Sequence, residues 1–396
     1  MNSKTSLRQE HSLVYGKSLF HRKRSTVWPG YVQRIVKGLS GYNEARRVSQ
    51  CGSKSMWWVC DGEESFGAWK QMLCRSRFCP VCSGAETKHL WDYLRYRMHE
   101  ITAAMHTGIR FWRWETTLPY EFRSFVSMTE GIDRFTALSV KWFESYLRRK
   151  LKVPDSVQLL TMVVPQWWGS KQPYGNGKFD PKHVHCHGVT LAFGFDPEVV
   201  ENGSVVKPAR AIHFSRQYLE DVGVNVKGSS SRFVGARSSW RKVLESEYGE
   251  VQAEDVDVKI RYEEGWDQWN HRTAYMLRSP AKDFSEWADM NGEKAVDLDW
   301  AREALTARVG KQRVRYYGAL SPKSQSPDSP FMKFLGLRLW NRKQYNYEQK
   351  KVFCPNGHEM HVVLGVHPED TAKLVEENEP FIARLPPWVH VPGRGG

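Results

Sequence analysis

Residues 183–193 read HVHCHGVTLAF, and this stretch is the most informative one for predicting the fold. Alternate side chains of a β-strand point to the same side, so His183, His185 and His187 would share one face of a strand that continues into a buried apolar tail. Neutral imidazole is a common ligand for divalent metal ions. The pattern therefore predicts a metal-binding strand, with a histidine-rich edge strand that binds nothing as the alternative.

A tyrosine on a predicted helix is the second candidate for chemistry. Residues 271–278 read HRTAYMLR, with good helix formers and apolar residues at helical spacing. On a helix, Tyr275 and Arg278 share a face. A cation beside a tyrosine oxygen favours the phenolate, or neutralises a phosphate that the oxygen attacks. The alternative is an amphipathic helix in which the tyrosine only packs.

The chain contains seven cysteines, most of them between residues 51 and 82. An odd number in a long chain without a secretory signal favours thiolate ligands over disulfides. Cys74, Cys79 and Cys82 have a spacing at which sulfur atoms reach one tetrahedral ion, and Cys51 or Cys60 would complete the site. Four thiolates leave no open coordination position, so we expect structural zinc rather than catalytic zinc.

The charge balance points to a polyanionic partner. Lys and Arg total 58 against 44 Asp and Glu, a formal net charge of +14, which favours nucleic acid. The 17 tryptophans offer flat surfaces for unstacked bases, with Trp167, Trp168 and either Trp112 or Trp114 as first candidates. We find no apolar stretch of about 18 to 20 residues and no secretory signal, so we expect a cytoplasmic protein without a membrane partner.

The order of predicted elements indicates an α+β fold. Residues 196–231 read as an insertion or a long loop, and residues 321–330 as a Ser- and Pro-rich linker. Periodicity predicts strands over 55–59, 109–118, 157–164 and the histidine segment, and helices over 86–105, 122–150, 232–248 and 267–278. We therefore expect an antiparallel sheet covered by helices.

Paired histidines on a strand, followed by a helical tyrosine, resemble the HUH endonucleases, most closely the rolling-circle replication initiators of small plasmids and phages. Two upstream segments extend the resemblance. Residues 74–82, CRSRFCPVC, are similar to the cysteine motif that precedes the nuclease in one plasmid initiator family, and Cys51-Gly52 matches its opening. Residues 114–119, WETTLP, are similar to the family's first motif. The resemblance covers residues 51–280 and implies a ferredoxin-like or RRM-like nuclease core.

The resemblance also implies a catalytic Mg²⁺ or Mn²⁺ site. His185 and His187 match the metal ligands, and His183 would be an alternative ligand or lie behind them. Gln166 stands where relatives often have Glu, and we expect its amide oxygen to be the third ligand. Asp180 and Glu115 are the other candidates for this position.

Tyr275 matches the family's nucleophile. Arg278 stands where relatives commonly have Lys, and the change keeps the positive charge. His271 stands where some relatives have Glu or a second Tyr, so we expect it to act as a general base one helical turn from Tyr275. Tyr262 is a weaker candidate for a second nucleophile.

The implied reaction is metal-dependent cleavage of single-stranded origin DNA. The tyrosine oxygen attacks phosphorus and the 3' oxygen leaves, which gives a 5'-phosphotyrosine and a 3'-OH primer. The partners would be single-stranded and double-stranded origin DNA, with a host helicase and DNA polymerase, because the sequence has no P-loop motif. A transposase or relaxase of the same superfamily, and a zinc-containing DNA-binding regulator without catalysis, are the alternatives.

These assignments divide the chain into four parts. A basic N-terminal arm would occupy residues 1–50, which carry ten Lys or Arg and only two acidic residues. A zinc-binding module would span residues 51–90 and the nuclease domain residues 91–280. Residues 281–396 would form a C-terminal region of unknown role that ends in a flexible tail.

Overall fold

The computed structural model divides into two compact units by their internal contacts. The central-sheet unit contains the described residues of Leu94–Leu277 and Asn291–Leu339, and the cysteine unit contains those of His11–Tyr93 and Trp340–Gly396. The structure describes residues 37, 42–49, 51, 55–60, 63–71, 74, 76, 79–123, 129–166, 184–224, 235–252, 256–277, 313–326, 328–336 and 360–366.

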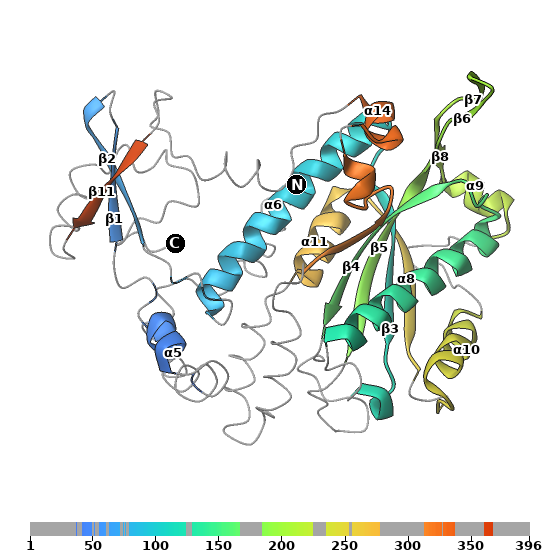
Figure 1. The fold of residues 1–396 in the computed structure, drawn as a ribbon, viewed down its shortest axis with the longest axis horizontal. Helices are drawn as coiled ribbons and strands as arrows, with labels where there is room; N and C mark the ends of the chain where they lie inside the picture. The colour runs from blue at the N-terminus through green and yellow to red at the C-terminus, as the bar shows by residue number, and fades with distance from the viewer. Residues whose placement is uncertain are drawn as a thin grey trace, which may run out of the picture. The chain divides into compact units, whose positions relative to one another are not determined.

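The central-sheet unit is built on an antiparallel sheet with β5 in the middle (Figure 1). The order across the sheet is β10-β4-β5-β3-β9, and β8 pairs with the far end of β5. The strands are β3 (Arg110–Thr117), β4 (Gln158–Gln166), β5 (His185–Asp196), β8 (Arg210–His213), β9 (Val258–Glu264) and β10 (Arg315–Gly318). The predicted α+β class, with an antiparallel sheet and helices, is therefore confirmed.

All twelve residues of β5 are buried, as expected for a strand covered on both faces. Gly188 lies opposite Trp114 of β3, and a Cβ atom at this position would overlap the indole ring. The indole donates from Nε1 to Thr190 Oγ1 at 3.1 Å and stacks on Phe143 with ring centroids 4.7 Å apart. The glycine next to the histidine pair thus allows a tryptophan to seal the opposite face of the strand.

Helices α8 (Thr129–Leu151) and α10 (Ala236–Tyr248) cover that opposite face, which we call the rear face (Figure 1). The rings of Trp142 on α8 and Trp240 on α10 lie 5.2 Å apart. Trp240 donates from Nε1 to the carbonyl oxygen of Thr117 on β3 at 3.2 Å. Aromatic packing and this hydrogen bond together join the two helices to the sheet.

The face that carries His185 and His187, the histidine face, packs against α11 (Trp266–Met276). Phe111 of β3 meets Trp269 of α11 edge to face at 5.3 Å. Trp266 at the start of α11 stacks on His99 of α6 (Pro80–Ala104) at 3.5 Å. These contacts place the C-terminal end of α11 beside the histidines.

Two segments predicted as irregular contain secondary structure. The region predicted as an insertion or a long loop forms β8, a two-stranded ribbon of β6 (Val199–Glu201) and β7 (Ser204–Lys207), and α9 (Arg216–Asp221). The region predicted as a linker includes η5 (Lys323–Gln325) and leads into α14 (Pro330–Leu335), where Ser329 caps the helix by accepting from the N–H of Met332. Propensity misled here because tertiary pairing and a Ser-Pro helix start outweighed the turn-like composition.

The tryptophan prediction was partly wrong. Trp112 and Trp114 are fully buried in the core, where Trp112 packs on Phe214 and Tyr262. Alternation along β3 turns both rings toward the rear face. Trp167 and Trp168 lie outside the described residues.

The ends of the remaining predicted elements in the described part of the chain agree with the structure to within seven residues. The helix predicted from residue 86 is α6, and the helical stretch predicted from residue 122 is α8, preceded by the short η2 (Tyr120–Phe122). In the described part of the chain, we find no helix with the length and apolar character needed to cross a bilayer.

The cysteine unit contains a three-stranded antiparallel sheet in the order β11-β1-β2. Strands β1 (Ser55–Cys60) and β2 (Glu63–Gln71) follow each other, whereas β11 (Met360–Val366) comes from the C-terminal region. Helix α5 (Tyr42–Ser49) precedes this sheet. Two segments of the region with no predicted role, β10 and β11, therefore each complete a sheet.

We expect Gly188→Ala to lower the free energy of unfolding by about 1 to 3 kcal/mol, because the added methyl group must displace the buried ring of Trp114. Gly108→Ala is the matched control, since a Cβ atom there meets nothing within 4 Å. Urea unfolding followed by tryptophan fluorescence measures both changes. Equal stability of the two variants would contradict the proposed packing role of Gly188.

Candidate functional site

The histidine pair brings two ring nitrogens together at the start of β5. The Nε2 atoms of His185 and His187 lie 3.0 Å apart, and the rings are perpendicular with centroids 4.6 Å apart. Both side chains are buried, with 4% and 2% of their surface exposed. Two imidazoles that bind one divalent ion in adjacent positions have nitrogens about 3 Å apart, so the donors fit such an ion.

The carboxylate of Glu115 lies beside Nδ1, the second ring nitrogen of His187. Glu115 faces His187 in the β3–β5 register, and its Oε2 lies 3.4 Å from Nδ1 of His187. A carboxylate at Nδ1 fixes the tautomer that leaves Nε2 as the donor to a metal. Glu115 therefore lies on the Nδ1 side of the His187 ring, whereas His185 lies on the Nε2 side.

Lys259 of β9 forms ion pairs with Glu115 and with Asp257. Its Nζ lies 3.4 Å from Oε1 of Glu115 and 3.0 Å from Oδ2 of Asp257. Burial alone would lower the pKa of Lys259, but the two carboxylates outweigh it and raise the pKa above its usual value. The ammonium group thus stays charged and keeps Glu115 partly neutralised.

Gln166 faces His185 from the other side, at the end of β4. Its Nε2 donates to the carbonyl oxygen of Met276 at 3.1 Å, which ties the end of β4 to the last turn of α11. This bond uses the amide nitrogen, so the amide oxygen is the atom of Gln166 with the chemistry of a ligand. Within the described residues, the histidine pair has no third His, Cys, Asp or Glu at ligand spacing.

Tyr275 lies beside the histidines on the last turn of α11. Its half-buried ring has its centroid 5.4 Å from that of His187, at an angle of 79°. Arg272 fixes the orientation of α11 about its own axis. Its Nε donates to both carboxylate oxygens of the buried Glu263 at 3.0 Å. Arg113 of β3 approaches the same carboxylate at 3.7 Å. This cluster fixes the face of α11 that carries Tyr275.

His271 lies one helical turn before Tyr275 and is exposed. Partial desolvation, followed by the nearby Arg272 guanidinium, holds the pKa of His271 below its usual value. The imidazole is therefore neutral at pH 7, the state in which it can accept a proton.

Tyr262 lies away from this group. It is buried on the rear face against Trp112, and burial raises the pKa of its hydroxyl above the usual range. The other candidates, His183, Asp180 and Arg278, lie outside the described residues.

Sequence reasoning missed the charged partners Lys259, Glu263 and Arg272. A signal for the first two was present, because Lys259, Arg261 and Glu263 alternate with apolar residues along β9. Such alternation predicts a charged strand face. The ion pair with Arg272 needed the packing of α11 and had no local signal.

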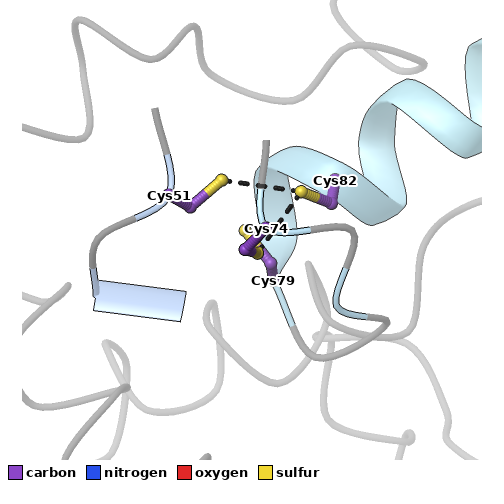
Figure 2. Close-up of side chains that lie close together, drawn as sticks. All are labelled: Cys51, Cys74, Cys79 and Cys82. Carbon is purple, nitrogen blue, oxygen red and sulfur yellow. Dashed lines mark hydrogen bonds between the residues drawn. The ribbon is translucent and has the colours of Figure 1, made fainter. Parts of the chain in front are cut away.

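The four cysteines Cys51, Cys74, Cys79 and Cys82 form a second cluster, in the cysteine unit (Figure 2). Their sulfur atoms all lie within 4.8 Å of one another, and Cys82 Sγ is 3.5 Å from both Cys51 Sγ and Cys74 Sγ. Pro80 starts α6, so Cys82 sits in its first turn, and Cys79 directly precedes the helix. The side chain of Cys60 on β1 is outside the described part of the structure. This cluster could hold a metal ion such as zinc.

The four thiols differ in how readily they lose their protons. Hydrogen bonds from Cys74, Cys79 and Cys82 hold the pKa of Cys51 well below its usual range, whereas the same network raises the pKa of Cys79. Four thiolates this close repel one another, and a divalent cation offsets that repulsion. Metal binding must displace the remaining protons, so it weakens as the pH falls.

We expect purified protein to contain about one zinc ion per chain and Cys79→Ser to lose most of it, because three thiolates bind zinc more weakly than four. Cys186→Ala is the matched control. Cys186 is buried on the rear face of β5, and burial raises the pKa of its thiol to about 12. Plasma mass spectrometry gives the zinc content. Equal zinc loss in the control would argue against the cluster.

Comparison with known proteins gives no relative from which a role of these two clusters could be inferred. The chain gives no significant match to protein-family models, to curated proteins or to solved structures. Its function is therefore inferred from its own residues. These are the histidines of β5, the tyrosine of α11 and the four cysteines of the cluster.

Proposed function

We propose that this chain is a metal-dependent, site-specific single-strand DNA endonuclease and strand transferase that starts rolling-circle replication. One observation carries the proposal. Two histidine Nε2 atoms lie 3.0 Å apart on a central strand, and the ring of a helical tyrosine lies 5.4 Å from one of them. This closeness supports the proposal, because a metal-dependent tyrosine nuclease needs its metal ligands and its nucleophile side by side.

The residues of the histidine face would divide the work among them. His185, His187 and the amide oxygen of Gln166 would hold Mg²⁺ or Mn²⁺, and Glu115 would orient His187. The chemistry that such a cation would supply is polarisation of the scissile phosphate and stabilisation of its developing negative charge.

Tyr275 would form the covalent bond to DNA. Its phenolic oxygen attacks phosphorus, and the phenolic proton passes to a base, for which neutral His271 is the nearest candidate along α11. The bond between phosphorus and the 3' oxygen breaks, and the 3' oxygen takes a proton to become a hydroxyl. The phosphotyrosine keeps the bond energy, so the reverse attack by a 3'-OH reseals the strand without nucleotide hydrolysis.

The surrounding charge suits a polyanionic strand. Lys259 and Arg113 lie on the histidine face, and Arg272 is on α11, which packs against it. Glu115 and Glu263 form ion pairs with these cations. The chain as a whole has a formal net charge of +14. Single-stranded and double-stranded origin DNA would be the partners, with a host helicase and DNA polymerase in the cytoplasm, and zinc would stabilise the cysteine unit.

Tyr275→Phe should abolish a covalent protein–DNA adduct, since the variant lacks the attacking oxygen. The assay incubates the protein with Mn²⁺ and a labelled single-stranded DNA library of random sequence, and resolves adducts on a denaturing gel. Tyr262→Phe is the matched control and should form adducts at the wild-type level, because that buried hydroxyl lies on the rear face.

The other outcomes select different functions. Adduct formed by Tyr275→Phe but not by Tyr262→Phe would reverse the assignment of the nucleophile. Tight DNA binding without any adduct would favour a zinc-containing DNA-binding regulator. An adduct that forms on transposon-end or conjugative-origin DNA instead would point to a transposase or relaxase.

Glu115→Gln should weaken Mn²⁺ binding about 10- to 100-fold, because the neutral amide no longer fixes the His187 tautomer. Electron paramagnetic resonance of free Mn²⁺, with zinc-loaded protein, gives the affinity. Glu264→Gln at the exposed end of β9 makes the same charge change and should leave the affinity within about twofold. Equal weakening in both variants would indicate a general charge effect and exclude this role of Glu115.

A further inference from the structure

The rear face carries a basic hollow that the proposed nuclease does not use. This hollow, of about 370 Å³, lies between the end of α8 and the start of α10. It is lined by Tyr146, Arg149 and Lys150 from α8, and by Gly235, Ser238, Ser239 and Lys242 from α10 and its cap. The spacings of three, four and seven residues place each set on a single helix face. We call it the α8–α10 pocket.

Aromatic packing beneath the pocket keeps its two walls in place. Trp142 donates from Nε1 to Ser239 Oγ at 3.2 Å, which joins α8 to α10. The ring of Trp142 also packs on Tyr146 at 5.7 Å and on Trp240 at 5.2 Å. Trp142 therefore joins the two walls, so the pocket is already formed without a ligand.

The pocket concentrates positive charge. Arg149, Lys150 and Lys242 form no ion pair within the described part of the chain, and the lining described there includes no carboxylate. The neighbouring Arg148 differs, because it donates to the carbonyl oxygens of Pro154 and Val157 and so serves the fold. Like charges gathered in one hollow raise the local potential and attract an anion.

The pocket also presents hydrogen-bond donors. The Ser239 hydroxyl accepts from the indole of Trp142 and can still donate its own proton, and Arg149 can donate two parallel N–H groups. The Ser238 hydroxyl donates to the carbonyl oxygen of Gly235, so it is not counted among the donors. Helix α10 begins at Gly235, which lines the pocket, so the positive end of the helix dipole adds to the potential on the same side. Tetrahedral phosphate oxygens can accept from Ser239 and from Arg149.

We propose that the α8–α10 pocket binds a backbone phosphate of DNA and so makes a second DNA contact on the face of the sheet opposite His185 and His187. DNA is favoured over a small anion because three cations in an open hollow match neighbouring phosphates of one strand. The contact goes beyond the nuclease and does not require Tyr275. It would position duplex DNA without reading its sequence.

The test compares two triple variants with equal charge. The pocket variant carries Arg149→Gln, Lys150→Gln and Lys242→Gln. The control carries three glutamines in place of exposed lysines outside the pocket, Lys141→Gln, Lys323→Gln and Lys333→Gln. Each lowers the formal net charge from +14 to +11, since 14 minus 3 is 11. Thermal unfolding confirms that both variants are folded.

Fluorescence anisotropy with a labelled DNA duplex of arbitrary sequence measures affinity between 50 and 200 mM KCl. We expect the pocket variant to bind about tenfold more weakly and its slope of log affinity against log salt to fall by about 1 to 2, because each phosphate contact contributes about 0.9. The control should stay within about twofold. Equal losses in both variants would overturn the proposal.

Three further measurements distinguish DNA from free phosphate as the ligand and separate the pocket from the nuclease. Calorimetry with inorganic phosphate that shows binding to wild type alone, together with unchanged duplex affinity of the pocket variant, would assign the pocket to free phosphate and overturn the DNA contact. Tyr275→Phe should keep wild-type duplex affinity, and the pocket variant should still form the covalent adduct. Failure of the nuclease proposal and failure of the pocket proposal are therefore distinguishable.

Discussion

The antiparallel pairing of β5 with β3 and β4 is the constraint on which the rest of the histidine site depends. One register places Glu115 opposite His187, and the other places Gln166 opposite His185. A shift of one residue in either ladder would turn these side chains to the rear face. The buried apolar residues that continue β5 hold both registers, so the core of the sheet and the geometry of the site are set by the same strand.

The helix that carries Tyr275 depends on the same sheet through polar contacts. Glu263 accepts two hydrogen bonds from Arg272, and Gln166 donates to the carbonyl oxygen of Met276. Breaking one partner of a buried ion pair leaves an uncompensated charge, which makes such contacts specific even where their net stability is small. The position of the Tyr275 ring beside His187 is therefore over-determined by contacts from β4 and β9.

Local patterns in the sequence were enough to predict the main helices and strands and most members of the two residue clusters. Alternation identified the histidine strand, helical spacing identified α11, and cysteine spacing identified three members of the cluster that Cys51 joins. The pairing of β10 and β11 was beyond reach, because short strands that join a sheet from a distant part of the chain have no local signal. The burial of Trp112 and Trp114 followed from which face of β3 became the rear face, and that depends on tertiary packing.

The two faces of the central sheet differ in how their charges are balanced. On the histidine face, Glu115 and Glu263 each lie against cations, so positive groups there are held in fixed positions and partly neutralised. In the α8–α10 pocket, the described cations have no such carboxylate partner. A fixed, balanced array orients a reacting group, whereas an unbalanced one attracts a polyanion over a longer range and responds more strongly to salt. This difference is the reason for proposing chemistry on one phosphodiester at the histidine face and capture of the surrounding DNA at the rear face.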